Sequence, residues 1–224
     1  MRIKTAIAEF KAPPPYGLFR KTTRIRALVV GPSDTPYDGG LFYFILKCPS
    51  TYPVNPPKAR IMTTDDGRVE FGTWIGPPWT QAQTIESVLI SIHSLLNENP
   101  FTNEPGASFF SLLMKILDYE RNYNSFLQHE TMRAAVCSKV EACLNATSPC
   151  PPVLREQVLK TFSESYEDYE KMTTERLNLT GTSLRDRFFN VKKVYQYETL
   201  LARLKNLNDR VKQRNEAAAQ AENK

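Results

Sequence analysis

The chain has 224 residues, 41% of them hydrophobic and 24% charged, with a formal net charge of +5. This apolar content can form a core, which excludes an intrinsically disordered chain, and the length suits one domain with an extension or one large domain. The chain has no apolar run long enough to span a membrane and no apolar signal region, and its four cysteines are not clustered. We therefore expect a cytoplasmic protein, with the nucleus as a second location, and no membrane partner.

The first predicted element is a short helix near the N-terminus. Ile3, Ala6, Ile7 and Phe10 recur at helical spacing, which predicts a helix over these residues. The run Pro13 to Pro15 would end it, because proline lacks a backbone donor.

Residues 24–63 predict three antiparallel strands. Apolar residues alternate along 24–31 and again along 41–47, and a shorter strand follows around Ile61. The first connection is rich in turn-forming residues, namely Asp34, Pro36, Gly39 and Gly40. Prolines 49, 53, 56 and 57 lack donors, so the ladder cannot continue through the second connection.

The motifs in this region occur in a distinctive order. They are Gly31-Pro32, the run Asp34-Thr-Pro-Tyr-Asp-Gly-Gly40, Tyr52-Pro53 and Pro56-Pro57. In this order they resemble the core of ubiquitin-conjugating enzymes. Downstream, residues 72–79 and 88–106 are similar to a narrower group, the long Z-type conjugating enzymes, which carry a helical extension. The resemblance covers about residues 3–211.

The resemblance implies an α+β architecture, the UBC fold. It is an antiparallel four-stranded meander packed on a main helix, with a C-terminal helical extension. Residues 1–123 would form the core and residues 124–224 the extension. The implied function is to carry ubiquitin or a ubiquitin-like modifier from an activating enzyme to substrate lysines with a ubiquitin ligase. Neither a cofactor nor a metal ion is implied.

One segment of the family pattern is missing. In the family, a fourth strand leads to an extended segment with an Asn, a Gly and the catalytic Cys, and then to a tryptophan turn. Here residues 63–71 resemble the fourth strand and pass directly to Gly72-Thr-Trp74. The thioester Cys and the Asn expected between Phe71 and Gly72 are therefore absent.

This loss removes the reacting groups of the family. Thioester transfer needs a cysteine thiolate as nucleophile, and a nearby donor for the developing oxyanion, which is the role of the family's asparagine. We therefore predict that the chain as written has no catalytic residue and is inactive. Its origin would be a splice variant or an incomplete gene model.

The remaining cysteines do not resemble the nucleophile. Cys48 occupies the family's usual Cys-Pro position, where we expect a buried structural thiol. Cys137 and Cys143 lie in a later helical stretch, and Cys150 lies between prolines. Inert buried thiols are the common case, so we predict that none of the four replaces the catalytic cysteine.

Three residues align with the loops through which the family contacts ligases. These are Val54, in the loop after Tyr52-Pro53, and Gln81 and Ala82, which follow a tryptophan. That tryptophan, Trp79, is expected to pack against the core. An exposed apolar residue carries little information by itself, so the assignment of Val54 comes from the resemblance.

A helix is predicted over residues 85–96, where apolar residues recur with helical period. Thr84 can cap its N-terminus. His93 lies off the apolar stripe and has no second His or Cys at ligand spacing, so we expect a surface histidine, and we interpret His129 in the same way.

The extension is predicted to hold three helices, over about 125–144, 154–172 and 194–211. The aromatic stripe of the second is expected to be core rather than a ligand site, and residues 217–222 are expected to fray. Residues 109–117 form an apolar run where the Z-type relatives have a polar loop, either a local helix or an unspliced fragment.

The sequence is compatible with two other functions. The chain could be a non-catalytic module that binds ubiquitin or a ligase, as are some relatives without the cysteine. Residues 192–214 contain seven basic and two acidic side chains, and a basic helix can face nucleic acid. A basic stripe is more often a solvated face, and no row of aromatic side chains alternates with these basic residues to stack on bases. We therefore expect no nucleic-acid partner.

Overall fold

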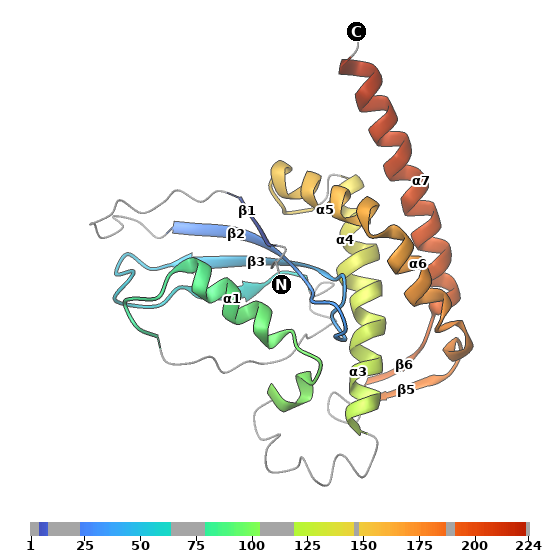
Figure 1. Cartoon of the computed structure of the whole chain (residues 1–224), viewed down its shortest axis with the longest axis horizontal. Coiled ribbons are helices and arrows are strands. Elements are labelled where there is room, and N and C mark those ends of the chain that lie inside the picture. Colours follow the sequence, from blue (N-terminus) through green and yellow to red (C-terminus); the bar gives the residue numbers. More distant parts are fainter. Residues whose placement is uncertain are drawn as a thin grey trace.

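The computed structural model describes residues 5–8, 23–63, 79–103, 119–145, 148–186 and 191–222. A β-sheet with helix α1 lies on one side of the molecule, and helices α3 to α7 gather on the other (Figure 1). This α+β arrangement confirms the predicted fold class.

The sheet has four antiparallel strands in the order β1-β2-β3-β4. They are Thr5–Ala8 (β1), Thr23–Val30 (β2), Leu41–Cys48 (β3) and Lys58–Ile61 (β4). The three strands predicted between residues 24 and 63 are confirmed. The strand predicted near residue 70 lies outside the described residues. Strand β1 lies at the opposite edge of the described sheet from β4.

The helix predicted near the N-terminus is wrong, because residues 5–8 form strand β1. Thr5 pairs with Val29 and Ala8 with Arg26 of β2. The apolar spacing of this segment fits a helix, but the edge of β2 carries backbone donors and acceptors that need partners. Pairing along that edge decides the conformation.

The connection between β2 and β3 is a closed turn. The Gly31 amide donates to the Gly40 carbonyl at 2.8 Å, and the Thr35 hydroxyl donates to the Pro32 carbonyl at 2.8 Å. A side chain at Gly31 is excluded, since its Cβ would lie 1.8 Å from the Tyr37 carbonyl oxygen. The turn therefore has the rigid backbone that its prolines and glycines predict.

Helix α1 spans Ile85–Leu95 and begins with the predicted cap at Thr84. The Ser87 amide donates to Thr84 Oγ1 at 3.2 Å, and the Thr84 amide donates to Ser87 Oγ at 2.9 Å, which is a reciprocal capping box. Ile85, Leu89 and Ile92 are buried in the same hydrophobic core as β2 and β3. A 3₁₀ turn, η1, follows at Pro100–Asn103.

The extension begins with one long helical stretch. Helix α3 (Tyr119–Glu130) continues through a π-helical segment, η2 (Thr131–Ser138), into α4 (Lys139–Leu144). This confirms the helix predicted over residues 125–144. The boundary expected between residues 123 and 124 falls inside α3, and the division into two domains stays a prediction. Residues 109–117 lie outside the described residues.

The second predicted helix is divided at Ser165. Its two parts are α5 (Pro152–Glu164) and α6 (Tyr166–Thr174). After a 3₁₀ turn, η3 (Leu177–Leu179), come a hairpin of β5 (Ser183–Asp186) and β6 (Val191–Val194) and the last helix, α7 (Tyr197–Glu222). The sequence did not predict the hairpin. Helix α7 includes residues 217–222, and the fraying expected for them stays a prediction.

The aromatic stripe of α5 and α6 belongs to the core, as predicted. Phe162 and Tyr169 are fully buried, and their rings stack with centroids 5.8 Å apart. The Tyr169 hydroxyl donates to the Gly39 carbonyl at 2.7 Å, which joins α6 to the β2–β3 turn. This contact fixes the extension against the sheet.

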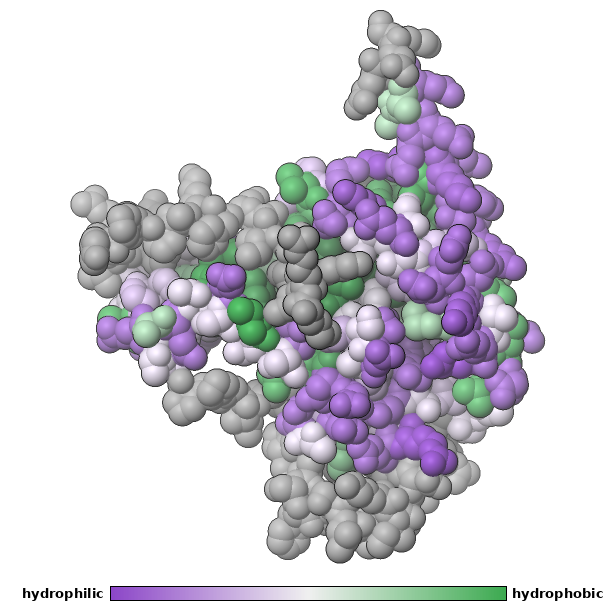
Figure 2. Space-filling model, viewed as in Figure 1, coloured by the Kyte–Doolittle hydropathy of each residue, from purple (hydrophilic) through white to green (hydrophobic). Residues whose placement is uncertain are grey.

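The surface of the C-terminal region is strongly hydrophilic. Figure 2 shows hydrophilic residues along the side of the molecule where α7 runs. In the part of the chain that the structure describes, none of the helices combines the length and the apolar character that crossing a bilayer requires.

Candidate functional site

Trp79 joins two loops, the one that follows strand β3 and the one that precedes helix α1. Its indole Nε1 donates to the Pro53 carbonyl at 2.9 Å, although 26 positions separate the two residues. The Trp79 ring also contacts the buried Tyr52 ring, with centroids 6.0 Å apart. Trp79 is partly buried against the core, which confirms the packing predicted for it. The indole thus holds the loop after β3 against the loop before α1.

The three predicted ligase-contact residues lie on these joined loops. Val54 is 54% exposed and follows the residue that Trp79 contacts. Gln81 and Ala82 are exposed in the second loop, two and three positions after Trp79. We call Val54, Gln81 and Ala82 the two-loop surface. It combines an exposed branched apolar side chain with an amide that can donate and accept, and none of the three residues titrates.

Both loops have internal hydrogen bonds that restrict their shape. The Val54 amide donates to the Thr51 carbonyl at 2.8 Å, and Asn55 Nδ2 donates to Thr51 Oγ1 at 2.8 Å. In the second loop, the Thr80 amide donates to Gln83 Oε1 at 2.9 Å. The exposed side chains therefore stand on a preorganised backbone, which lowers the entropy cost of binding a partner.

All four cysteines of the chain are buried and free. Burial raises the pKa of Cys137 to about 12, and burial also raises the pKa of Cys48 and of Cys143. A thiol in this state is a poor nucleophile, because the thiolate is the reactive form. For Cys48, Cys137 and Cys143, the prediction of a structural thiol is consistent with this burial. The junction at Phe71 and Gly72 lies outside the described residues.

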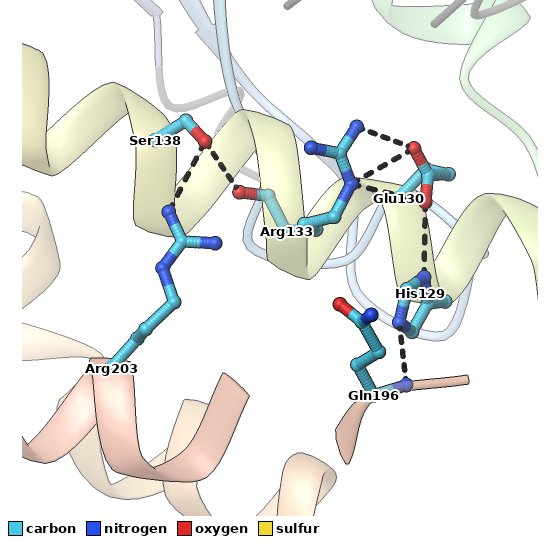
Figure 3. A network of polar contacts seen from close by, with 6 residues as sticks. All are labelled: His129, Glu130, Arg133, Ser138, Gln196 and Arg203. Atoms are coloured by element: carbon cyan, nitrogen blue, oxygen red, sulfur yellow. Dashed lines mark hydrogen bonds and ion pairs between the residues drawn. The ribbon is translucent and has the colours of Figure 1, made fainter. Parts of the chain in front are cut away.

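The prediction of a surface position for His129 is wrong. Its side chain is 2% exposed, and Nδ1 lies 3.0 Å from Glu130 Oε1. Nε2 accepts from the Gln196 amide at 3.2 Å, and Arg133 completes the network at Glu130 (Figure 3). Gln196 is 67 positions away from His129, so no local pattern could have revealed this contact.

His129 thus links α3 to the start of α7. The rings of Tyr195 and Tyr197 pack edge-on against the imidazole, at 5.5 and 5.3 Å between centroids. His93 is half-buried, and this burial lowers its pKa. Among the described residues, no cluster of His, Cys, Asp and Glu could hold a metal ion. The histidine at 129 is therefore structural.

The basic side chains of α7 make intramolecular contacts. Arg203 pairs with Glu141 of α4 at 2.8 Å, Lys205 with Glu170 of α6 at 3.7 Å, and Arg214 with Glu156 of α5 at 2.6 Å. Each pair joins α7 to a different helix. Exposed pairs contribute little individually. These three cations are directed at helices of the same chain.

Known proteins resemble this chain over nearly its whole length. The family model described as ubiquitin-conjugating enzyme matches residues 4–126. The chain is 39% identical over 234 residues to ubiquitin-conjugating enzyme E2 Z of Xenopus tropicalis, covering 96% of this chain and 72% of that protein. With E2 Z of Homo sapiens it shares 40% identity over 234 residues, covering 96% of this chain and 64% of the relative.

A second group of relatives matches a shorter region. The ubiquitin-conjugating enzyme E2-22 kDa of Drosophila melanogaster is 38% identical over 82 residues, covering 33% of this chain and 41% of that protein. The alignments with the two E2 Z proteins span 234 residues, which exceeds the 224 residues of this chain. They must therefore contain positions that those relatives have and this chain lacks.

Proposed function

Because the chain belongs to the ubiquitin-conjugating enzyme family and is of the Z type, we propose that it keeps the family's partner-binding scaffold without its thioester chemistry. The ordinary role would be to carry ubiquitin or a related modifier from an activating enzyme to substrate lysines with a ligase. This chain would lack the carrier step. It would act in the cytoplasm and the nucleus.

The observation that carries the proposal is the state of the cysteines. A carrier needs a thiolate that meets the thioester of the activating enzyme. The sequence has no cysteine between Cys48 and Cys137, where the family's nucleophile would stand after Phe71. The four thiols it has are buried. The alignments with the E2 Z relatives are longer than this chain, which supports a deleted segment but does not show where in the chain it lies.

A charging assay tests the loss of the thioester. The purified chain is incubated with an activating enzyme, ATP and ubiquitin, and then run on a gel with and without a reductant. We expect no reducible adduct, while human E2 Z as the positive control forms one. A reducible adduct on this chain would contradict the proposal, and a Cys→Ser series would then identify the acceptor among Cys48, Cys137, Cys143 and Cys150.

The origin of the deletion is tested on the transcript. Sequencing across the codons for Phe71 and Gly72 should show whether the junction exists in the cell. An in-frame segment with an Asn and a Cys would mean that the cellular protein is an ordinary conjugating enzyme. An abundant transcript with the junction would leave a non-catalytic product.

The two-loop surface favours a second candidate function, in which the chain binds a ligase without delivering a modifier. Trp79 holds the two loops together, and Val54, Gln81 and Ala82 are exposed on them. An uncharged protein on this surface would compete with charged conjugating enzymes for the ligase. The partner implied by the family is a ubiquitin ligase domain that contacts conjugating enzymes through these loops.

Binding to such a ligase domain tests the second candidate, with an exposed valine elsewhere as the control. Val54→Asp should weaken binding at least about tenfold, which corresponds to about 1.4 kcal/mol. Val153 of α5 is 70% exposed and lies outside both loops, so Val153→Asp should leave the affinity unchanged. Equal effects of the two substitutions, or no binding by the unsubstituted chain, would refute this function.

A further inference from the structure

Lys139 and Cys150 form a close pair in the interior of the extension. Lys139 is the first residue of α4, and Pro151 separates Cys150 from the first residue of α5. The Lys139 Nζ donates to Cys150 Sγ at 2.8 Å. The two residues are 8% and 4% exposed, so both reacting atoms are held away from bulk water.

The surroundings of Lys139 are unusual for a buried lysine. Buried charges are normally paired with an opposite charge, but no carboxylate of the described residues pairs with this amine. Its other contact is the face of the Tyr43 ring, with Nζ 4.5 Å from the centroid. The amine therefore points at the sulfur with no competing ion pair from the described parts of the chain.

Hydrogen bonds hold Cys150 and the residue before it in position. Its backbone amide donates to Ser148 Oγ at 3.2 Å. The Tyr43 hydroxyl donates to the Pro149 carbonyl at 3.5 Å, which ties the preceding residue to β3. Reacting atoms held within about 3–3.5 Å are in a near-attack geometry. The nitrogen and the sulfur already lie within that distance.

We propose that Lys139 and Cys150 are an oxidative modification site, at which a peroxide converts the contact into a covalent nitrogen–sulfur cross-link. Hydrogen peroxide oxidises the thiol to a sulfenic acid; the O–O bond breaks, an S–O bond forms and one water leaves. The lone pair of the lysine amine nitrogen then attacks the sulfur. An S–N bond forms, the S–O bond breaks, and the hydroxyl group takes a proton from the nitrogen and leaves as a second water.

Sulfenic acids condense with backbone nitrogen to give sulfenamides, and the amine of Lys139 would react in the same way. The sulfur is oxidised by two electrons and the peroxide is reduced by two, so the step needs no further reactant. The product would tie the first turn of α4 to Cys150 in the segment before α5 and close the loop between them. This modification is independent of the proposed carrier deficiency, and its test uses no conjugation assay.

Mass spectrometry of the whole chain tests the site. After treatment with hydrogen peroxide we expect a loss of about 2 Da, and a tryptic map in which one looped peptide, residues 134–155, replaces the separate peptides 134–139 and 140–155 that contain Lys139 and Cys150. Thiol reductant should restore both peptides. The single peptide arises because trypsin does not cleave after a modified Lys139.

A disulfide between Cys143 and Cys150 would give the same change in mass, so two variants separate the products. Cys143→Ser should still form the cross-link, whereas Lys139→Arg should lose it, because a guanidinium is a poor nucleophile. Finding a Cys143–Cys150 disulfide, a free Cys150 thiol or a sulfinic acid at Cys150 in the oxidised chain would overturn the proposal. The peptide map of the unsubstituted chain decides this even if a variant fails to fold.

Discussion

The contact between Gly39 and Tyr169 predicts a strong coupling between two substitutions. Gly39 has φ +67°, and a Cβ there would lie 2.5 Å from Tyr169 Cε1. Gly39→Ala should therefore cost about 1–2 kcal/mol for the left-handed backbone and about 1–3 kcal/mol for overpacking. In the unsubstituted background, the free energy of unfolding should fall by about 2–5 kcal/mol in all.

Removing the ring should relieve only the second part of this cost. In a Tyr169→Ala background, Gly39→Ala should cost about 1–2 kcal/mol, because the backbone penalty remains. Tyr169→Phe is the matched control: it removes the hydroxyl that donates to the Gly39 carbonyl, at a cost of about 1 kcal/mol, but keeps Cε1. The full cost of Gly39→Ala should persist in that background.

Urea unfolding followed by far-UV circular dichroism measures these differences, provided that the slopes with denaturant agree among the variants. Tyr169→Ala itself should cost about 3–5 kcal/mol as a core truncation, so each comparison is made within one background. An equal cost of Gly39→Ala with and without the ring would refute the reasoning. The extension would then not be packed on the β2–β3 turn as described.

Three further predictions concern the loops, a buried thiol and the buried histidine. Trp79→Phe removes the donor to the Pro53 carbonyl and should lower the free energy of unfolding by about 1 kcal/mol. It should also weaken ligase binding severalfold in a titration, and an unchanged affinity would contradict this prediction. Because burial raises the pKa of Cys137 from 9.0 to about 12, the unfolded chain loses this proton first, and stability should fall as the pH rises from about 9 to 12. Denaturant unfolding of Cys137→Ala should show a smaller fall over that range, and an identical fall would argue against the assignment. His129→Leu leaves the Gln196 amide without its acceptor and should cost about 1–3 kcal/mol in urea unfolding; an unchanged midpoint would show that water replaces the imidazole.

Much of the fold was predictable because it follows from local patterns. Alternation along residues 24–31 and 41–47 predicted β2 and β3, since side chains alternate across a strand. Helical periodicity predicted α1 and the helical character of the extension, and Thr84 was recognised as the cap of α1. The ordered motifs around the β2–β3 turn identified the family, and through it the two-loop surface.

What the sequence alone could not provide were contacts between residues far apart in the chain. Residues 5–8 have a helical pattern but became a strand because β2 offers an edge to pair with. His129 has no local sign of burial, and it is buried because Gln196 and two tyrosines close over it. The approach of Lys139 to Cys150 likewise depends on where the loop between α4 and α5 returns. Local sequence determined which segments became β2, β3 and α1, whereas partners brought together only by folding decided β1, the burial of His129 and the Lys139–Cys150 contact.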